Sequence, residues 1–133
     1  MTEVRDPVWI DKAALLLLHG ESLAMFGGSE GLRDEGLLDS ALARPMQLLA
    51  YGDPPPDLAA LIAACASGLA HNHPFVDGNK RVALLSIGLM LDLNGFELTV
   101  DQPECFQAMI ALADGSMTEE MLAEWLRRNS RAL

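Results

Sequence analysis

Apolar residues recur along most of the chain at the three- and four-residue spacing that buries one face of a helix. These stretches mostly begin at an aspartate, serine or threonine, which can cap a helix, and they end near glycine or proline. The pattern predicts about six helices, over residues 11–26, 34–43, 57–71, 78–94, 101–113 and 116–128. Between the fourth and fifth helices, residues 98–100 are expected to form a short extended piece.

Prolines mark the main interruptions of this pattern. Arg44-Pro45 is expected to end the second helix, because proline lacks an amide hydrogen and its ring disfavours a helical residue before it. The connection over residues 51–56 ends in consecutive prolines, which predicts a stiff and exposed segment. Pro74 likewise ends the third helix and leaves a tight loop over residues 72–77.

The fourth predicted helix is apolar on nearly all sides. From Val82 to Leu91 it is interrupted only by the small residues Ser86 and Gly88, and a helix that is apolar all round belongs at the centre of a bundle. Aromatic residues make up only 5% of the chain, whereas leucine and alanine are abundant, which favours helices over a β-sandwich. We therefore expect a single all-α domain over residues 1–133, a compact bundle around this buried central helix.

The net charge limits the kinds of partner that this protein can bind, and the cysteine content indicates its cellular compartment. The formal net charge of −10 repels phosphate backbones and anionic lipid surfaces, so we expect neither direct nucleic-acid binding nor membrane docking. The apolar run from Val82 to Leu91 is too short to span a bilayer. The cysteines are far apart in sequence and lack zinc-binding spacing, which suits a cytoplasmic protein with reduced thiols.

The junction before the fourth helix gathers residues suited to phosphate chemistry. Amides in the first turn of a helix have no helical partner and, with the helix dipole, attract anions. Gly78 lets a ligand approach the backbone, and Lys80 and Arg81 add cations in the same turn. Asp77 adds a carboxylate suited to Mg²⁺ on phosphates, and His73 adds a titratable base. This combination is what phosphoryl or nucleotidyl transfer requires.

Each of these residues also has a simpler structural explanation. Asp77 alone would serve as a helix cap, and His73 alone would be a structural histidine. Lys80 and Arg81 alone would be solvated residues on a first turn. A structural explanation, however, gives no reason for all of them to crowd into one junction. Phe75 is expected to anchor the loop in the core under either interpretation.

Residues 73–81, with the sequence HPFVDGNKR, resemble the Fic signature H-x-F-x-[DE]-[AG]-N-[GK]-R at every specified position. Residues 26–28, 31–38 and 94–96 are similar to Doc-type members of the Fic/Doc family, and so is the chain length. The resemblance implies the helical Fic/Doc fold and an enzyme that moves part of ATP onto a hydroxyl of another protein.

The resemblance also implies a role for each matched residue. His73 would be the general base that takes the proton from the target hydroxyl. Asp77 would hold Mg²⁺ on the phosphates of ATP, and Asn79 would orient the transferred phosphate. Arg81 would neutralise phosphate charge, while the backbone of Gly78 would help to form the anion hole.

Lys80 distinguishes two reactions within the family. Adenylylating Fic enzymes usually have glycine here and Doc has lysine, so the resemblance implies a reversed nucleotide and transfer of the γ-phosphate. The implied target is translation elongation factor Tu, whose modification halts translation. Pro74 and Gly78 instead resemble the adenylylating signature, so adenylyl transfer (AMPylation) to a protein hydroxyl is the alternative. A further alternative is a non-catalytic interaction module, against which the complete signature speaks.

Regulation is expected to come from a partner chain. Self-inhibited Fic proteins carry the motif [ST]-x-x-x-E-[GN], and neither Glu30-Gly31 nor Glu35-Gly36 fits it. The resemblance to Doc-type members implies a toxin, which without an internal inhibitor would poison its own cell. We therefore expect a Phd-like antitoxin that lays a chain segment into a groove of the bundle.

The remaining candidate residues lie outside the signature. Residues 51–56 fall where Fic proteins carry a flap that aligns the target chain. His19 is expected to be structural, and His71 matches no specified position of the signature. Arg127, Arg128 and Arg131 are expected to stabilise the C-terminal end of the last helix by their charge.

Overall fold

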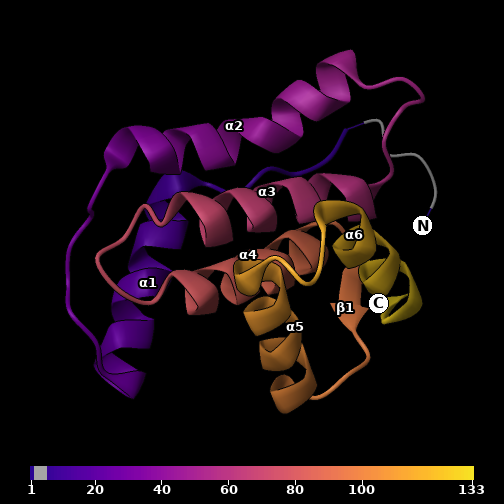
Figure 1. The fold of residues 1–133 in the computed structure, drawn as a ribbon. Helices are drawn as coiled ribbons and strands as arrows, with labels where there is room; N and C mark the ends of the chain where they lie inside the picture. Colours follow the sequence, from indigo (N-terminus) through magenta and orange to yellow (C-terminus); the bar gives the residue numbers. More distant parts are fainter. Residues whose placement is uncertain (2–5) are drawn as a thin grey trace.

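The computed structural model describes residues 1 and 6–133, which form a helical bundle with one small sheet (Figure 1). The predicted all-α fold is confirmed, and none of the described helices is long and apolar enough to cross a membrane. The described elements are α1 (Lys12–Phe26), α2 (Glu35–Tyr51), α3 (Leu58–Asn72), α4 (Asn79–Leu93), β1 (Phe96–Leu98), α5 (Gln102–Asp114), α6 (Glu119–Arg128) and β2 (Ser130–Ala132).

Side-chain caps explain where most of the helices begin. A side-chain oxygen at the start of each accepts a backbone amide hydrogen that the helix leaves unpaired. The capping residues are Asp11, Asp34, Asp57, Asp101 and Thr118. The four aspartates stand at the predicted helix starts, whereas the last helix begins slightly after its predicted start at residue 116. Helix α4 is the exception among the described helices, because Gly78 stands at its cap position and has no side chain.

Helix α2 does not end at Pro45, so that prediction was wrong. The helix runs on to Tyr51 and contains Pro45 in its interior. An interior proline costs about 3 kcal/mol or more, because it removes one helical hydrogen bond and clashes with the preceding turn. Pro45 is buried, and Figure 1 shows α2 lying along α3. Burial of this face against α3 therefore outweighs the local cost.

The most buried helix is α3 rather than α4, which corrects the predicted identity of the central helix. Every residue from 61 to 70 is buried, and α3 packs against α2, α4, α5 and α6. Its small residues allow close approach, since a Cβ at Gly68 would lie 3.0 Å from the Cα of Ala41 in α2. Helix α4 buries one side only, and Leu84 and Leu89 on its other side stay partly exposed.

A small sheet joins β1 to the end of the chain. The two strands are antiparallel, with Glu97 opposite Arg131, and their side chains form an ion pair at 2.7 Å. The extended piece predicted at residues 98–100 is found slightly earlier, over Phe96–Leu98. The pairing strand was not predicted, because it lies 34 residues further along the chain and is too short to have a pattern of its own.

Arg127 ties the last helix to the start of the most buried one. Its Nε and Nη2 donate to Oδ2 and Oδ1 of Asp57 at 2.7 and 2.9 Å, and Asp57 also accepts the amide of Ala60 at 2.9 Å. Burial raises the pKa of Asp57, but the bonds from Arg127 and from Ala60 outweigh it and hold that pKa below its usual value. Asp57 therefore acts both as the cap of α3 and as an ion-pair partner of α6.

Asp57→Ala is expected to lower the free energy of unfolding by about 1–2 kcal/mol, because both functions are lost. Asp57→Asn keeps a side chain that can cap α3 but removes the charge, so its loss of stability measures the contribution of the ion pair alone. The pKa of Asp57 is lower in the folded protein than in the unfolded chain, so its carboxylate stabilises the fold. This stabilisation is complete above the unfolded-state pKa of about 4 and is lost as the pH falls through the folded-state pKa. Denaturant unfolding of the parent protein and of Asp57→Asn at about pH 7 and about pH 3 checks this. The difference in unfolding free energy between the two proteins should shrink at the lower pH, and a difference that is the same at both pH values would contradict the prediction.

Candidate active site

The loop between α3 and α4 is a tight reversal that starts and ends in the left-handed backbone region. His73, the C-terminal cap of α3, has φ 48° and ψ 57°, and Gly78 at the start of α4 has φ 80°. Within the described chain, His73 is the one non-glycine residue with a positive φ. This conformation costs about 1–2 kcal/mol for a residue with a Cβ, so contacts from outside the loop must hold it.

Phe75 and His19 hold the loop from the inside. Phe75 is 2% exposed, and its ring stacks on the ring of His19 with the centroids 3.8 Å apart. His19 is itself buried, and its Nε2 lies 2.8 Å from the carbonyl oxygen of Asp77. Sequence reasoning missed the connection of His19 to the site, because no local pattern links residues 58 positions apart.

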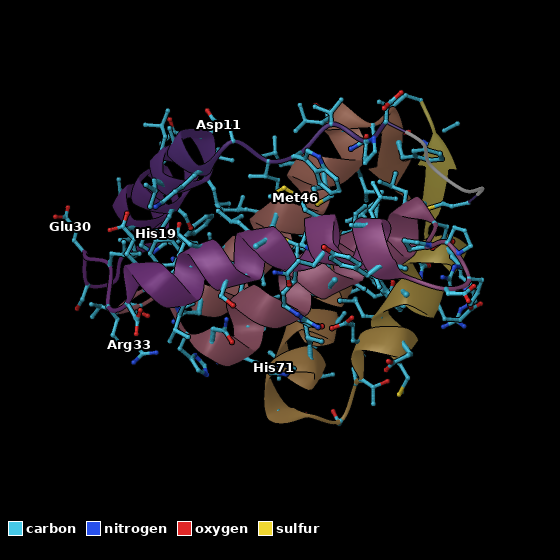
Figure 2. All side chains as sticks on the ribbon, turned by 90° about the horizontal axis from the view of Figure 1, so that it is seen from above. Asp11, His19, Glu30, Arg33, Met46 and His71 are labelled. Atoms are coloured by element: carbon cyan, nitrogen blue, oxygen red, sulfur yellow. The ribbon has the colours of Figure 1, made fainter. Side chains whose placement is uncertain are left out.

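The segment after α1, residues 27–34, lies along the outside of the same loop. The carbonyl of Pro74 accepts the amides of Arg33 and Asp34 at 2.7 and 3.0 Å, and the amide of Val76 donates back to this segment at 3.0 Å. Figure 2 shows Arg33 at the end of the bundle where α1 also brings His19. The loop is therefore held between α1 on one side and residues 27–34 on the other.

Residues 51–56 do not lie near this loop, so the predicted position of a flap was wrong. That segment joins α2 to the start of α3, whereas the loop follows the end of α3. Helix α3 has 15 residues and is therefore about 22 Å long. Figure 1 shows the two connections at opposite ends of α3. Residues 27–34 are the segment beside the candidate site instead.

The loop opens into a polar cleft of about 270 Å³ that brings the predicted functional residues together. The cleft is lined by His73, Val76, Asp77, Gly78, Asn79, Lys80, Arg81 and Phe106. Every predicted site residue except the buried Phe75 therefore borders one space. Phe106 comes from α5 and was not predicted, because an aromatic residue on a helix gives no sign of what it will lie beside.

A second, more apolar cavity of about 550 Å³ adjoins this cleft. Arg81 and Phe106 line both spaces, and the far wall of the second is formed by Phe26, Leu84, Gln102 and Pro103. A ligand with phosphates in the cleft could therefore extend an apolar or aromatic group past Phe106.

Two charged side chains of the cleft, Asp77 and Arg81, are anchored to the segment after α1. Asp77 accepts the amides of Ser29 and Gly78 at 3.2 and 2.8 Å, and these bonds, with the nearby charge of Arg81, lower the pKa of Asp77. Arg81 donates to a backbone carbonyl of the same segment at 3.0 Å. Lys80 is exposed and has no ion-pair partner among the described residues. The cleft thus holds an ionised carboxylate beside cations.

The first turn of α4 presents unpaired amides at the same place. Among the residues that the structure describes, no oxygen accepts from the backbone N–H of Asn79, Lys80 or Arg81. Unpaired amides and the positive end of the helix dipole attract an anion. The absence of a capping side chain at Gly78 leaves these donors to a ligand, and a phosphate group is the ligand that the surrounding cations suit.

Two polar side chains near the cleft have backbone partners. Asn79 accepts the amide of Phe75 at Oδ1 and donates to its carbonyl from Nδ2, both at 3.0 Å, so it holds the loop. Its implied role in orienting a phosphate stays a prediction. The Nε2 of His71 lies 2.8 Å from the carbonyl of Leu112, which links α3 to α5 and does not border the cleft.

Asp77 is the candidate ligand for Mg²⁺, and it has no second carboxylate beside it in the cleft. The described residues contain no group of three or more side chains that could cage a metal. Magnesium usually binds through one or two carboxylates together with substrate phosphates. A single carboxylate next to unpaired amides therefore fits a metal that arrives with a phosphate-bearing ligand.

Gly28→Ala is expected to weaken the binding of a metal-bound phosphate ligand in the cleft, because a Cβ there would lie 2.9 Å from Oδ2 of Asp77 and 2.8 Å from Leu23. Gly115→Ala, at the end of α5, is the matched control, since its φ is also positive but a Cβ meets nothing within 4 Å. Both should lose stability, by about 1–2 kcal/mol. Only Gly28→Ala should bind Mg-ATP more weakly by calorimetry, and equal affinities of the two variants would contradict this.

Fold and site together define a small helical domain in which a loop-to-helix junction forms a polar cleft that suits a phosphate group and has a histidine in its wall. The model of the Fic/DOC family matches residues 9–91, from before α1 to near the end of α4. This chain therefore belongs to the Fic/DOC family.

Two relatives are similar to this chain over different lengths. Toxin Doc of Mycolicibacterium smegmatis is 48% identical over 77 residues, which cover 57% of this chain and 58% of that toxin. Protein kinase doc of Escherichia phage P1 is 32% identical over 119 residues, which cover 90% of this chain and 93% of the kinase. The aligned part thus spans less than two thirds of the first relative and almost all of the second.

Proposed function

We propose that this protein is a Doc-type toxin that transfers the γ-phosphate of ATP to a hydroxyl of a target protein. The observation that carries the proposal is the shared cleft, which His73 lines together with Asp77, Lys80, Arg81 and the unpaired amides of α4. The 32% identity to a protein named as a kinase, over 90% of this chain, supports it. The similarity to a protein named as a toxin supports the cellular role.

His73 acts as the general base in this mechanism. Its imidazole takes the proton of the target hydroxyl, whose oxygen forms a bond to the γ-phosphorus of ATP. The bond from that phosphorus to the β–γ bridging oxygen breaks, and ADP leaves with the electron pair. Arg81 and the α4 amides hold the phosphates and neutralise the charge that develops. Mg²⁺, when bound beside Asp77, would neutralise further phosphate charge.

Lys80 favours phosphate transfer over adenylyl transfer. Its side chain borders the cleft from the first turn of α4, where a glycine would leave room for the outer phosphates of ATP. With that room filled, the γ-phosphate takes the place next to His73. The adenosine then extends toward the adjoining apolar cavity past Phe106.

The test incubates the purified protein with elongation factor Tu, the proposed target, and ATP labelled at either the α or the γ phosphate. Transfer of the γ label alone is expected. Transfer of the α label alone would overturn the kinase proposal in favour of adenylyl transfer, which Pro74 and Gly78 favour in the signature. Lys80→Gly should weaken transfer of the γ-phosphate, because it removes the side chain that keeps ATP from binding with its α-phosphate next to His73.

Mass spectrometry of cellular proteins after expression identifies the target independently. A mass increase of one phosphate on elongation factor Tu supports the full proposal and places the activity in the cytoplasm, where translation occurs. The same mass increase on another protein would identify a different target while still supporting the proposed reaction.

A Phd-like antitoxin is the proposed partner, and the apolar surface between α1, α4 and α5 is its proposed groove. A cavity of about 490 Å³ there is walled mostly by aliphatic side chains, among them Leu18, Leu85 and Leu89. Leu17 and Met25 of α1 are 64% and 75% exposed. An amphipathic helix can lay its apolar face into such a groove. The net charge of −10 favours a basic partner.

Leu89→Glu tests this groove, because it places a charge in the apolar wall. Co-expressed antitoxin should no longer rescue growth from the variant, while the variant itself stays toxic. If the antitoxin restored growth equally well with the variant and with the parent protein, it would bind at a surface other than this groove.

A further inference from the structure

The last turn of α3 ends with carbonyl oxygens that no helical amide can reach. The guanidinium of Arg33 takes two of them: Nη2 donates to Asn72 at 2.8 Å and Nε donates to His73 at 2.7 Å. The next carbonyl, that of Pro74, accepts the backbone amides of Arg33 and Asp34. The carbonyls before, at and after His73 are therefore all bound by two neighbouring residues about 40 positions earlier in the chain.

These bonds fix the backbone of His73. The carbonyls of Asn72 and His73 belong to the two peptide planes that meet at the His73 Cα, and each plane is rigid. One planar guanidinium holds both planes, so it holds φ and ψ in the left-handed region and sets the direction of the imidazole. Its positive charge at the C-terminal end of α3 is also favourable.

We propose that Arg33 is a positioning residue for His73, holding the imidazole in the cleft without touching the substrate. This proposal rests on the proposed role of His73 as general base. Arg33 is exposed and does not line the cleft, and Figure 2 shows it at the outside of the bundle. The described residues also give Arg33 no carboxylate partner, so its donors are directed to the loop carbonyls.

Arg44 provides a control, because it is also an arginine whose guanidinium donates to a backbone carbonyl of α3. Its Nη1 donates to the carbonyl of Ala64 in α3 at 2.9 Å, and its Nη2 pairs with Glu119 at 2.7 Å. It lies away from the loop, so loss of Arg44 removes an arginine-to-α3 bond without affecting His73. Arg33→Ala and Arg44→Ala therefore separate positioning from general stabilisation.

The first measurement is amide hydrogen exchange on the two purified variants. The amides of Phe75 and Val76 are hydrogen-bonded within the loop and its outer segment, and they should exchange faster in Arg33→Ala. They should exchange at the parent rate in Arg44→Ala. Unchanged exchange of residues 72–78 in Arg33→Ala would overturn the proposal, whether or not the protein transfers phosphate.

The second measurement is steady-state transfer of labelled γ-phosphate to elongation factor Tu. Arg33→Ala should lose about 10²-fold in kcat, the effect of a misplaced catalytic group, with the KM for ATP unchanged. Arg33→Lys should stay impaired, since an ammonium lacks the two parallel donors. Added guanidinium ion should restore part of the activity of Arg33→Ala and should leave the activity of Arg44→Ala unchanged.

The outcomes separate the two proposals. A kcat for Arg33→Ala equal to that for Arg44→Ala would overturn the positioning role while leaving the kinase proposal intact. If the parent protein and His73→Ala transferred label equally poorly, the proposed function would fail. The hydrogen-exchange result would then still decide whether Arg33 holds the loop.

Discussion

Replacement of His73 by asparagine is expected to lower the rate of the proposed phosphate transfer by about 10²–10⁴-fold, the usual contribution of a positioned general base. Asparagine tolerates the left-handed backbone that His73 adopts, but its amide cannot take up a proton. ATP should still bind, because Asp77, Arg81 and the α4 amides are unchanged. Single-turnover transfer of labelled γ-phosphate measures the rate, and calorimetry measures nucleotide binding.

His71→Asn is the matched control for this variant. His71 also lies at the end of α3, but its ring contacts the carbonyl of Leu112 and does not line the cleft. It should therefore keep a transfer rate close to that of the parent protein. On expression in cells, His73→Asn should abolish growth arrest and His71→Asn should retain it. If His73→Asn arrested growth as strongly as the parent, catalysis would not be the cause, and the non-catalytic interaction module would explain the protein better.

Phe75→Ala is expected to lower the free energy of unfolding by about 3–5 kcal/mol, the usual cost of removing a buried aromatic ring. Phe75 is 2% exposed and stacks on His19, so its loss opens a space that the loop cannot fill without moving. The backbone of Phe75 also carries both hydrogen bonds of Asn79. Activity should therefore fall together with stability, because the anchor sits between His73 and Asp77 in the loop.

Denaturant unfolding monitored by circular dichroism measures this effect. Phe75→Leu, which keeps most of the buried apolar volume, should cost less than Phe75→Ala. Phe106→Ala is a second control, because Phe106 is 38% exposed and its loss should cost little stability. A small stability change for Phe75→Ala, comparable to that for Phe106→Ala, would show that the loop does not depend on its aromatic anchor.

Local chemistry made several features predictable from the sequence. Caps such as Asp34 and Thr118 act on amides two or three residues away, so helix starts were predicted well. The residues from His73 to Arg81 are also adjacent in the chain, and one turn into one helix brings most of them to a single cleft. The family could therefore be inferred from a short contiguous signature, which the match over residues 9–91 confirms.

Contacts between distant segments decided the rest. Helix α2 passes through Pro45 because packing against α3 outweighs a local cost, and no local rule contains that packing. Three residues around the loop also come from parts of the chain outside the signature. Phe106 forms a wall of the cleft, and His19 and Arg33 hold the loop by hydrogen bonds to its backbone carbonyls.

The sequence by itself thus determined the number of helices, the start of most of them and the set of reactive side chains, because capping, periodicity and the signature act over a few residues. Only the tertiary structure decided which helix is central, where the loop is held and what surrounds the cleft. The physical reason is that burial and hydrogen bonding between distant segments depend on how all the helices pack together, and no single stretch of sequence contains that information.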